Sequence, residues 1–126
     1  RGLIMNTQNN KLVIVATHGI DNELSSVALT LANGAITDGM EVTIFLTSAG
    51  IDLVRKRGIE LTHVAPLGTL KELVDSFMSR GGRIVACPPC VASRGYIQED
   101  LIDGVEIAGG STIFAQFKTG AASLSF

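Results

Sequence analysis

The chain has 126 residues, enough for one domain, whereas two domains would each lack a sufficient hydrophobic core. The net charge is −2 and no long basic stretch occurs, which argues against nucleic-acid binding. The apolar runs are far shorter than a membrane span, so we expect no membrane partner either. Charged residues make up only 17% of the chain, which indicates either surface that self-association shields from water or a surface rich in glycine and serine.

The N-terminal residues 1–10 are predicted to be a disordered or cloning-derived segment, with Met5 as the natural start. They precede a single domain over residues 11–126. The segment lacks the long apolar region of a secretion signal, which favours a cytoplasmic location. The chain has two cysteines, which in that compartment indicate sulfur, redox or metal chemistry before a structural disulfide.

The first half of the domain alternates apolar runs with helical patterns. Residues 12–16 form a continuous β-branched run, typical of a strand that is covered on both faces. A helix follows, capped by Asp21 or Asn22, and residues 42–46 form a second strand. Residues 48–50 then lead into a short helix that we expect Gly58 to close, followed by a loop over residues 59–68.

The second half repeats the alternation. Thr69 and Glu72 have the spacing of a capping box and predict a helix that Gly81-Gly82 ends. The remaining elements are expected to be a strand at 83–87, a short helix at 98–102, a strand at 105–107, a helix at 111–117 and a strand at 122–126. This order predicts an α/β fold with a mostly parallel sheet and helices on both faces.

The carboxyl ends of the strands predict where the chemistry lies. In open α/β sheets, ligands bind just beyond those ends, near a change in strand order. His18 follows the first strand, Ser48 follows the second, and Cys87 ends the third, so these side chains should project from one edge. The reactive form of cysteine is the thiolate, which His18 or Arg94 would stabilise. We therefore predict Cys87 and His18 as catalytic residues, with Ser48 and Arg94 binding the substrate.

Each of these residues also has a purely structural interpretation. Cys87 could be an inert buried cysteine, and His18 an ordinary loop residue. We predict Cys90 as a second catalytic thiol that resolves the chemistry of Cys87, although it could equally be a small residue packed under the loop. His63, in the irregular segment before Pro66, has the weakest claim.

The sequence Cys87-Pro88-Pro89-Cys90 has two further interpretations. A thioredoxin-like motif would lie early in the chain and face a later proline, but the only other proline is Pro66. A zinc site would combine both cysteines with His18 and His63, which lack the usual histidine spacing. We therefore predict no metal and no cofactor.

Several segments together resemble a known family. They are the run 83–87, the stretches 94–97 and 99–109, and the C-terminal residues 122–126. Together they resemble the DsrE/DsrF-like sulfur-relay family, which includes Tus-type and YchN-like proteins. The resemblance implies a flavodoxin-like, three-layer α/β/α domain with a five-stranded sheet, assembled into homo-oligomers, often trimers or hexamers. It also implies a persulfide on a cysteine just after the third main strand, the position of Cys87. The double proline departs from the pattern.

Three functional hypotheses follow. The leading one is a sulfur-relay protein that carries sulfane sulfur as a persulfide on Cys87 and passes it to a partner protein. The second is a non-catalytic oligomeric module that binds a small ligand or a protein at the same edge. The third is a two-thiol redox protein that uses Cys87 and Cys90. Ligand affinity that survives Cys87→Ser would favour the second hypothesis, and a reversible disulfide under mild oxidant would favour the third.

Overall fold

A computed structural model describes residues 10–57 and 68–126 of the chain. Two segments are therefore not discussed structurally. The predictions made for residues 1–9, for His63 and for Pro66 lie outside the described residues. Within the described part of the chain, none of the helices has both the length and the hydrophobicity that crossing a bilayer requires.

The elements alternate along the chain as the sequence predicts. The strands are β1 (Lys11–Ala16), β2 (Glu41–Leu46), β3 (Arg83–Ala86), β4 (Glu106–Ile107) and β5 (Ala122–Ser125). The α-helices are α1 (Glu23–Thr37), α2 (Leu70–Ser79), α3 (Pro88–Ser93) and α4 (Ser111–Lys118). Two 3₁₀ helices, η2 (Ser48–Val54) and η4 (Gln98–Asp100), complete the set.

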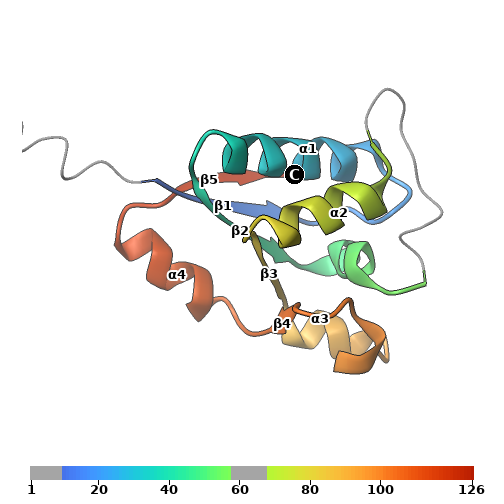
Figure 1. Cartoon of the computed structure of the whole chain (residues 1–126). Helices are drawn as coiled ribbons and strands as arrows, with labels where there is room; N and C mark the ends of the chain where they lie inside the picture. The colour runs from blue at the N-terminus through green and yellow to red at the C-terminus, as the bar shows by residue number, and fades with distance from the viewer. Residues whose placement is uncertain (1–9, 58–67) are drawn as a thin grey trace, which may run out of the picture.

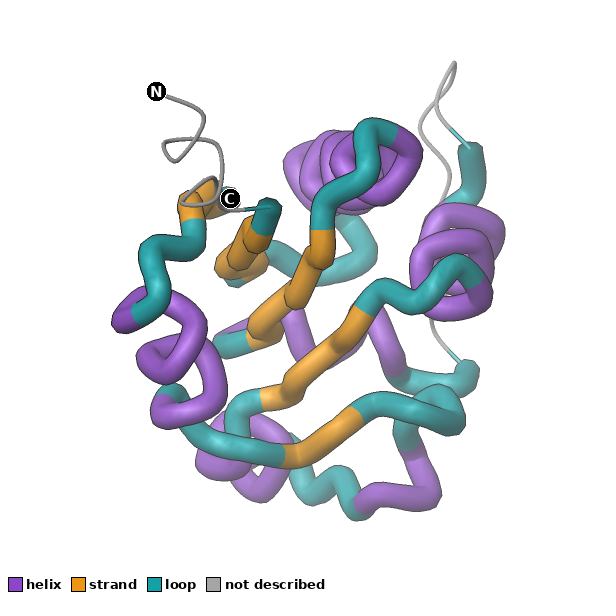
Figure 2. The backbone as a smooth tube through the Cα atoms, turned by 60° about the vertical axis from the view of Figure 1, so that its left-hand side comes forward, coloured by secondary structure: helices purple, strands orange, loops and turns teal. Residues whose placement is uncertain are grey.

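The strands form one five-stranded sheet in the order β4-β3-β2-β1-β5, and all neighbouring pairs are parallel (Figure 2). The chain advances from β1 through β2 and β3 to β4, then returns to place β5 on the other side of β1. The predicted parallel sheet is therefore confirmed. The change of direction in strand order lies between β1 and β5.

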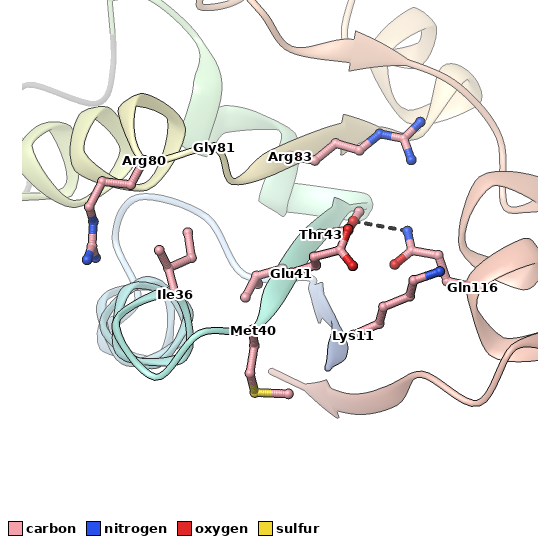
Figure 3. Close-up of a pocket in the computed structure, with 10 residues that line it drawn as sticks. Lys11, Ile36, Met40, Glu41, Thr43, Arg80, Gly81, Arg83 and Gln116 are labelled. Carbon is pink, nitrogen blue, oxygen red and sulfur yellow. Dashed lines mark hydrogen bonds between the residues drawn. The ribbon is translucent and has the colours of Figure 1, made fainter. Parts of the chain in front are cut away.

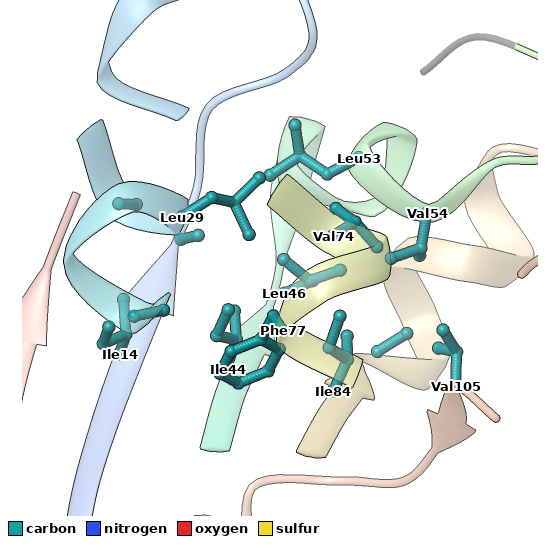
Figure 4. Close-up of a cluster of buried hydrophobic side chains, with 14 of the residues drawn as sticks. Ile14, Leu29, Ile44, Leu46, Leu53, Val54, Val74, Phe77, Ile84 and Val105 are labelled. Atoms are coloured by element: carbon teal, nitrogen blue, oxygen red, sulfur yellow. The ribbon is translucent and has the colours of Figure 1, made fainter. Parts of the chain in front are cut away.

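Helices cover both faces of the sheet, which gives three layers. Helices α1 and α2 lie on one face and α4 lies on the other (Figures 1 and 2). The larger core lies under α1 and α2, where Phe77 of α2 packs among strand residues that include Ile44 and Ile84 (Figure 4). A smaller core under α4 contains Val13, Phe45, Val85 and Ile113. Because residues of β1, β2 and β3 enter both cores, these central strands contain runs of apolar residues, as expected from the sequence.

Local signals at the helix ends are confirmed. Asn22 Oδ1 accepts a hydrogen bond from the backbone N–H of Leu24 at 2.9 Å and caps α1. At the start of α2, the Thr69 hydroxyl accepts from the backbone N–H of Glu72 at 3.1 Å, and the Glu72 carboxylate accepts from the backbone N–H of Thr69 at 3.3 Å. Each cap satisfies backbone donors that the first helical turn leaves unpaired.

The segment after the third strand differs from the prediction. No helix is predicted here from the sequence, but the two prolines occupy the first two positions of α3, and Cys87 is the residue that precedes the helix. The strand itself ends at Ala86, one residue earlier than predicted. The helix forms here because proline is well suited to the first turn, where an N–H has no intrahelical partner in any case.

Candidate functional site

The carboxyl ends of the three central strands are level with one another. The Cys87 N–H donates to the carbonyl of Leu46 at 2.9 Å, and the Thr47 N–H donates to the carbonyl of Ala16 at 3.2 Å. Hydrogen bonding across the sheet thus continues one residue beyond each strand. Thr17, Thr47 and Cys87 consequently form a row along this edge, each following an aligned strand end.

Cys90, one helical turn after Cys87, is the thiol with the most developed set of contacts. Its Sγ lies 3.3 Å from the hydroxyl oxygen of Thr47. The backbone N–H of Ser48 donates to the same sulfur at 3.2 Å. The sulfur of α3 is thereby held against the end of β2, and both donors approach it from that strand end.

The two prolines limit the helix-capping contacts that are available to Cys87. A side chain that precedes a helix ordinarily accepts from the N–H groups of the first turn. Here Pro88 and Pro89 have no N–H, and the Cys87 side chain accepts no such capping hydrogen bond. The sulfur at Cys90 instead lies over the start of η2, where the N–H of Ser48 is available.

The backbone at Ser48 adopts an unusual conformation. Its φ is 55°, the left-handed region that residues other than glycine rarely occupy. Such a conformation costs about 1–3 kcal/mol and persists only where the surrounding structure enforces it. The N–H of Ser48 donates the hydrogen bond that Cys90 Sγ accepts, so the strained backbone coincides with the thiol contact.

Thr47 directly precedes η2, yet its hydroxyl does not cap that helix. The hydroxyl contacts Cys90 Sγ instead.

These contacts stabilise the Cys90 thiolate. The hydrogen bond from the Thr47 hydroxyl has the largest effect and, together with that from the Ser48 N–H, lowers the pKa of Cys90 below its ordinary value of 9.0. Partial burial has the opposite effect and raises the pKa. The neighbouring Cys87 thiol and the positive charge of Arg94 lower the pKa further. Both cysteines are free and half-buried.

The other predicted site residues lie at different distances from this pair. Ser48 belongs to the site through its backbone, and Arg94 lies near Cys90, whose carbonyl accepts from the Arg94 guanidinium at 3.4 Å. The Nδ1 atom of His18 lies 3.4 Å from the Thr17 hydroxyl oxygen, and no hydrogen bond among the described residues joins the His18 ring to a cysteine.

Two residues of this region, Thr47 and Tyr96, were not predicted as part of the site from the sequence. The first is Thr47, whose role depends on the alignment of strand ends. The second is Tyr96, whose hydroxyl donates to the carboxylate of Asp52 at 2.7 Å, with the guanidinium of Arg55 4.9 Å from the ring centre. The Asp52 hydrogen bond raises the pKa of Tyr96, so this group remains a protonated donor. The contact ties the segment after α3 to η2, which carries the Ser48 N–H.

A cavity of about 410 Å³ lies at the opposite end of the sheet, where β1, β2 and β3 begin (Figure 3). Lys11, Glu41, Arg83 and Gln116 are among the residues that line it, and none of the predicted site residues does so. No group of three or more histidine, cysteine, aspartate or glutamate side chains in residues 10–57 and 68–126 is arranged to hold a metal ion. The paired thiols at the carboxyl edge of the sheet are therefore the candidate site.

The fold and the strand-end thiols define the class: a three-layer α/β protein with a parallel sheet and a cysteine pair at its carboxyl edge. The chain belongs to the DsrE/DsrF-like family, whose model matches residues 10–126. That family is associated with sulfur relay. The predicted family and fold class are thereby confirmed.

Relatives and solved structures agree with this assignment. An uncharacterized protein of Methanopyrus kandleri is 34% identical over 96 residues, which cover 76% of each chain. One of Methanocaldococcus jannaschii is 30% identical over 76% of this chain and 81% of its own length. The crystal structure of the YchN protein from E. coli superimposes with a TM-score of 0.75 at 19% identity, covering 94% of this chain and all of that chain. At this level of identity the structural match supports the fold.

Proposed function

We propose that the protein is a sulfur carrier, in which the Cys90 thiolate takes up sulfane sulfur as a persulfide and passes it to the cysteine of a partner protein. The observation that carries the proposal is the set of donors around Cys90 Sγ: the Thr47 hydroxyl at 3.3 Å and the Ser48 N–H at 3.2 Å. A thiolate, not a thiol, attacks sulfur. A reducing compartment such as the cytoplasm keeps both cysteines available for this role.

The transfer is a balanced exchange of one sulfur atom. The Cys90 thiolate attacks the terminal sulfur of a donor persulfide, a Cys90 Sγ–S bond forms, and the donor's own S–S bond breaks to release its thiolate. In the second half of the cycle, an acceptor thiolate attacks the terminal sulfur held on Cys90. That step returns the Cys90 thiolate, so no metal, cofactor or net redox change is needed.

Cys87 is the alternative carrier. Its position directly after the third strand is the one that the family resemblance assigns to the persulfide cysteine. Cys87 also packs against both hydrophobic cores, so it is held as firmly as the sheet itself. The two assignments differ in a measurable way, because only one of the two thiols is required for uptake.

Intact-protein mass spectrometry distinguishes the carriers. Wild type, Cys87→Ser and Cys90→Ser are incubated with glutathione persulfide at neutral pH, separated from excess donor and weighed at once. We expect Cys90→Ser to lose uptake by about tenfold or more, because the stabilised thiolate is gone. Cys87→Ser should still gain the mass of one sulfur atom.

Loss of uptake in Cys87→Ser with normal uptake in Cys90→Ser would identify Cys87 as the sulfur carrier, as predicted from the sequence. Uptake that is equal in wild type and in the variant lacking both cysteines would show that neither thiol carries sulfur. Ser79→Ala provides a control, since Ser79 is an exposed residue of α2 outside the site, and its hydroxyl donates to the carbonyl of Ser76.

A further inference from the structure

The spacing of the two thiols defines their geometry. Cys87 immediately precedes α3 and Cys90 lies in its first turn, three residues later. The Cys87 carbonyl accepts from the Val91 N–H at 3.0 Å, so Cys87 already follows the helical hydrogen-bond pattern. Residues three apart at the start of a helix are neighbours on its surface, which places the two thiols on the same side of α3.

The two thiols also influence each other electrostatically. The Cys87 thiol contributes to the lowered pKa of Cys90 and so helps to stabilise its thiolate. The intervening residues are both prolines, whose fixed φ angles restrict the turn and hold the sulfurs together before any reaction.

We infer that Cys87 is a resolving thiol: it attacks Cys90 Sγ once that sulfur carries a persulfide, and so releases the carried sulfur as hydrogen sulfide with formation of a Cys87–Cys90 disulfide. This inference rests on the proposed uptake at Cys90 and adds a second activity, reductive release of sulfide, to transfer between proteins. It assigns a function to the cysteine pair that a single-thiol relay does not need.

The atoms and electrons of the release step balance. A Cys87 Sγ–Cys90 Sγ bond forms, and the bond between Cys90 Sγ and the terminal sulfur breaks. The terminal sulfur leaves with the bonding electron pair and, with its own proton and the one that Cys87 loses, becomes hydrogen sulfide. The sulfane sulfur is reduced by two electrons and the two thiols are oxidised to the disulfide. A dithiol reductant must then restore both thiols for another cycle.

Proximity decides whether release competes with transfer. An internal thiol one helical turn away acts at a high effective concentration, which favours it over external thiols at ordinary concentrations. Transfer to a partner therefore requires that the partner reach the terminal sulfur before Cys87 reacts. The double proline, the feature that departs from the family pattern, is what keeps Cys87 in position.

A single-turnover experiment tests the release step. Wild type and Cys87→Ser are loaded with limiting glutathione persulfide, freed of donor, and followed by intact mass and by trapping of sulfide with monobromobimane. In wild type we expect stoichiometric sulfide and a protein lighter than its reduced form by two hydrogen atoms. The disulfide should disappear on addition of dithiothreitol.

The variant separates the two proposals. Cys87→Ser should take up one sulfur atom and retain it. Its rate of sulfide release should be lower than that of wild type by about tenfold or more, because serine cannot form the disulfide. Sulfide release at the wild-type rate from Cys87→Ser would overturn the inference and leave uptake at Cys90 intact. Failure of wild type itself to take up sulfur would overturn the proposed function, and the release step with it. Circular dichroism confirms that the variant is folded.

Discussion

Replacing Phe77 with alanine is expected to lower the free energy of unfolding by about 4 kcal/mol. Phe77 is a fully buried side chain on α2, where it contacts residues of β2 and β3 (Figure 4). Truncation removes its buried apolar surface and leaves a cavity that close-packed neighbours fill only in part. Urea denaturation followed by circular dichroism measures the change.

Phe114 provides the matched control for this substitution. It is also a phenylalanine on a helix, but 56% of its surface is exposed. We expect Phe114→Ala to change the free energy of unfolding by no more than about 0.5 kcal/mol. Comparable losses in the two variants would show that α2 does not cover the main core in the way described.

Gly50→Ala is the second large effect, with an expected loss of about 3 kcal/mol in the free energy of unfolding. A Cβ atom at Gly50 would overlap the backbone carbonyl of Ala16 at the end of β1. Because backbone cannot rotate away as a side chain can, η2 must shift from the sheet. Such a shift would carry the Ser48 N–H away from Cys90, so alkylation of Cys90 should also slow.

Gly34→Ala isolates the steric cause. Gly34 lies in α1, and a Cβ atom added there has no neighbour within 4 Å. Alanine at this position should stabilise the protein by about 0.5–1 kcal/mol, because glycine is a poor helix former. Thermal and urea denaturation of both variants checks the contrast, and a Gly50→Ala protein as stable as wild type would rule out the close approach of η2 to β1.

The local part of the fold could be predicted from the sequence because its signals are local. The capping box at Thr69 and Glu72 marks the start of α2 within four residues of chain. The apolar run 12–16 likewise indicates a strand covered on both faces, which its burial confirms. In contrast, Pro88-Pro89 fits both a rigid exit from a strand and a helix start, and only the surrounding packing favours the helix.

The details of the site depended on information that a single sequence does not contain. The strand order places the change of direction between β1 and β5, beside His18, whereas the thiols lie at β2 and β3. The left-handed conformation of Ser48 has no sequence signal, because serine is not typical of that region. The sequence thus predicts thiols at the carboxyl edge of the sheet, while the contacts that favour Cys90 come from the tertiary structure.

The central claim is that two groups directly after β2, the Thr47 hydroxyl and the Ser48 N–H, stabilise the thiolate of Cys90. The pH dependence of Cys90 alkylation tests this claim most directly. Iodoacetamide labelling of wild type, Thr47→Val and Thr47→Ser is followed by fragmentation mass spectrometry, which separates label on Cys90 from label on Cys87. Since hydrogen bonds lower the pKa of Cys90, its labelling should rise with pH through a midpoint below 9.0.

Thr47→Val removes the hydroxyl at 3.3 Å, so the labelling midpoint should move upward and labelling at neutral pH should fall about fivefold. Thr47→Ser keeps the hydroxyl and should restore the wild-type profile. Since the Cys90 pKa is depressed in the folded state, the associated stability is present above pH 9.0 and is lost as the pH falls through the folded-state pKa. A Cys90 midpoint at or above 9.0, unchanged in Thr47→Val, would contradict the account.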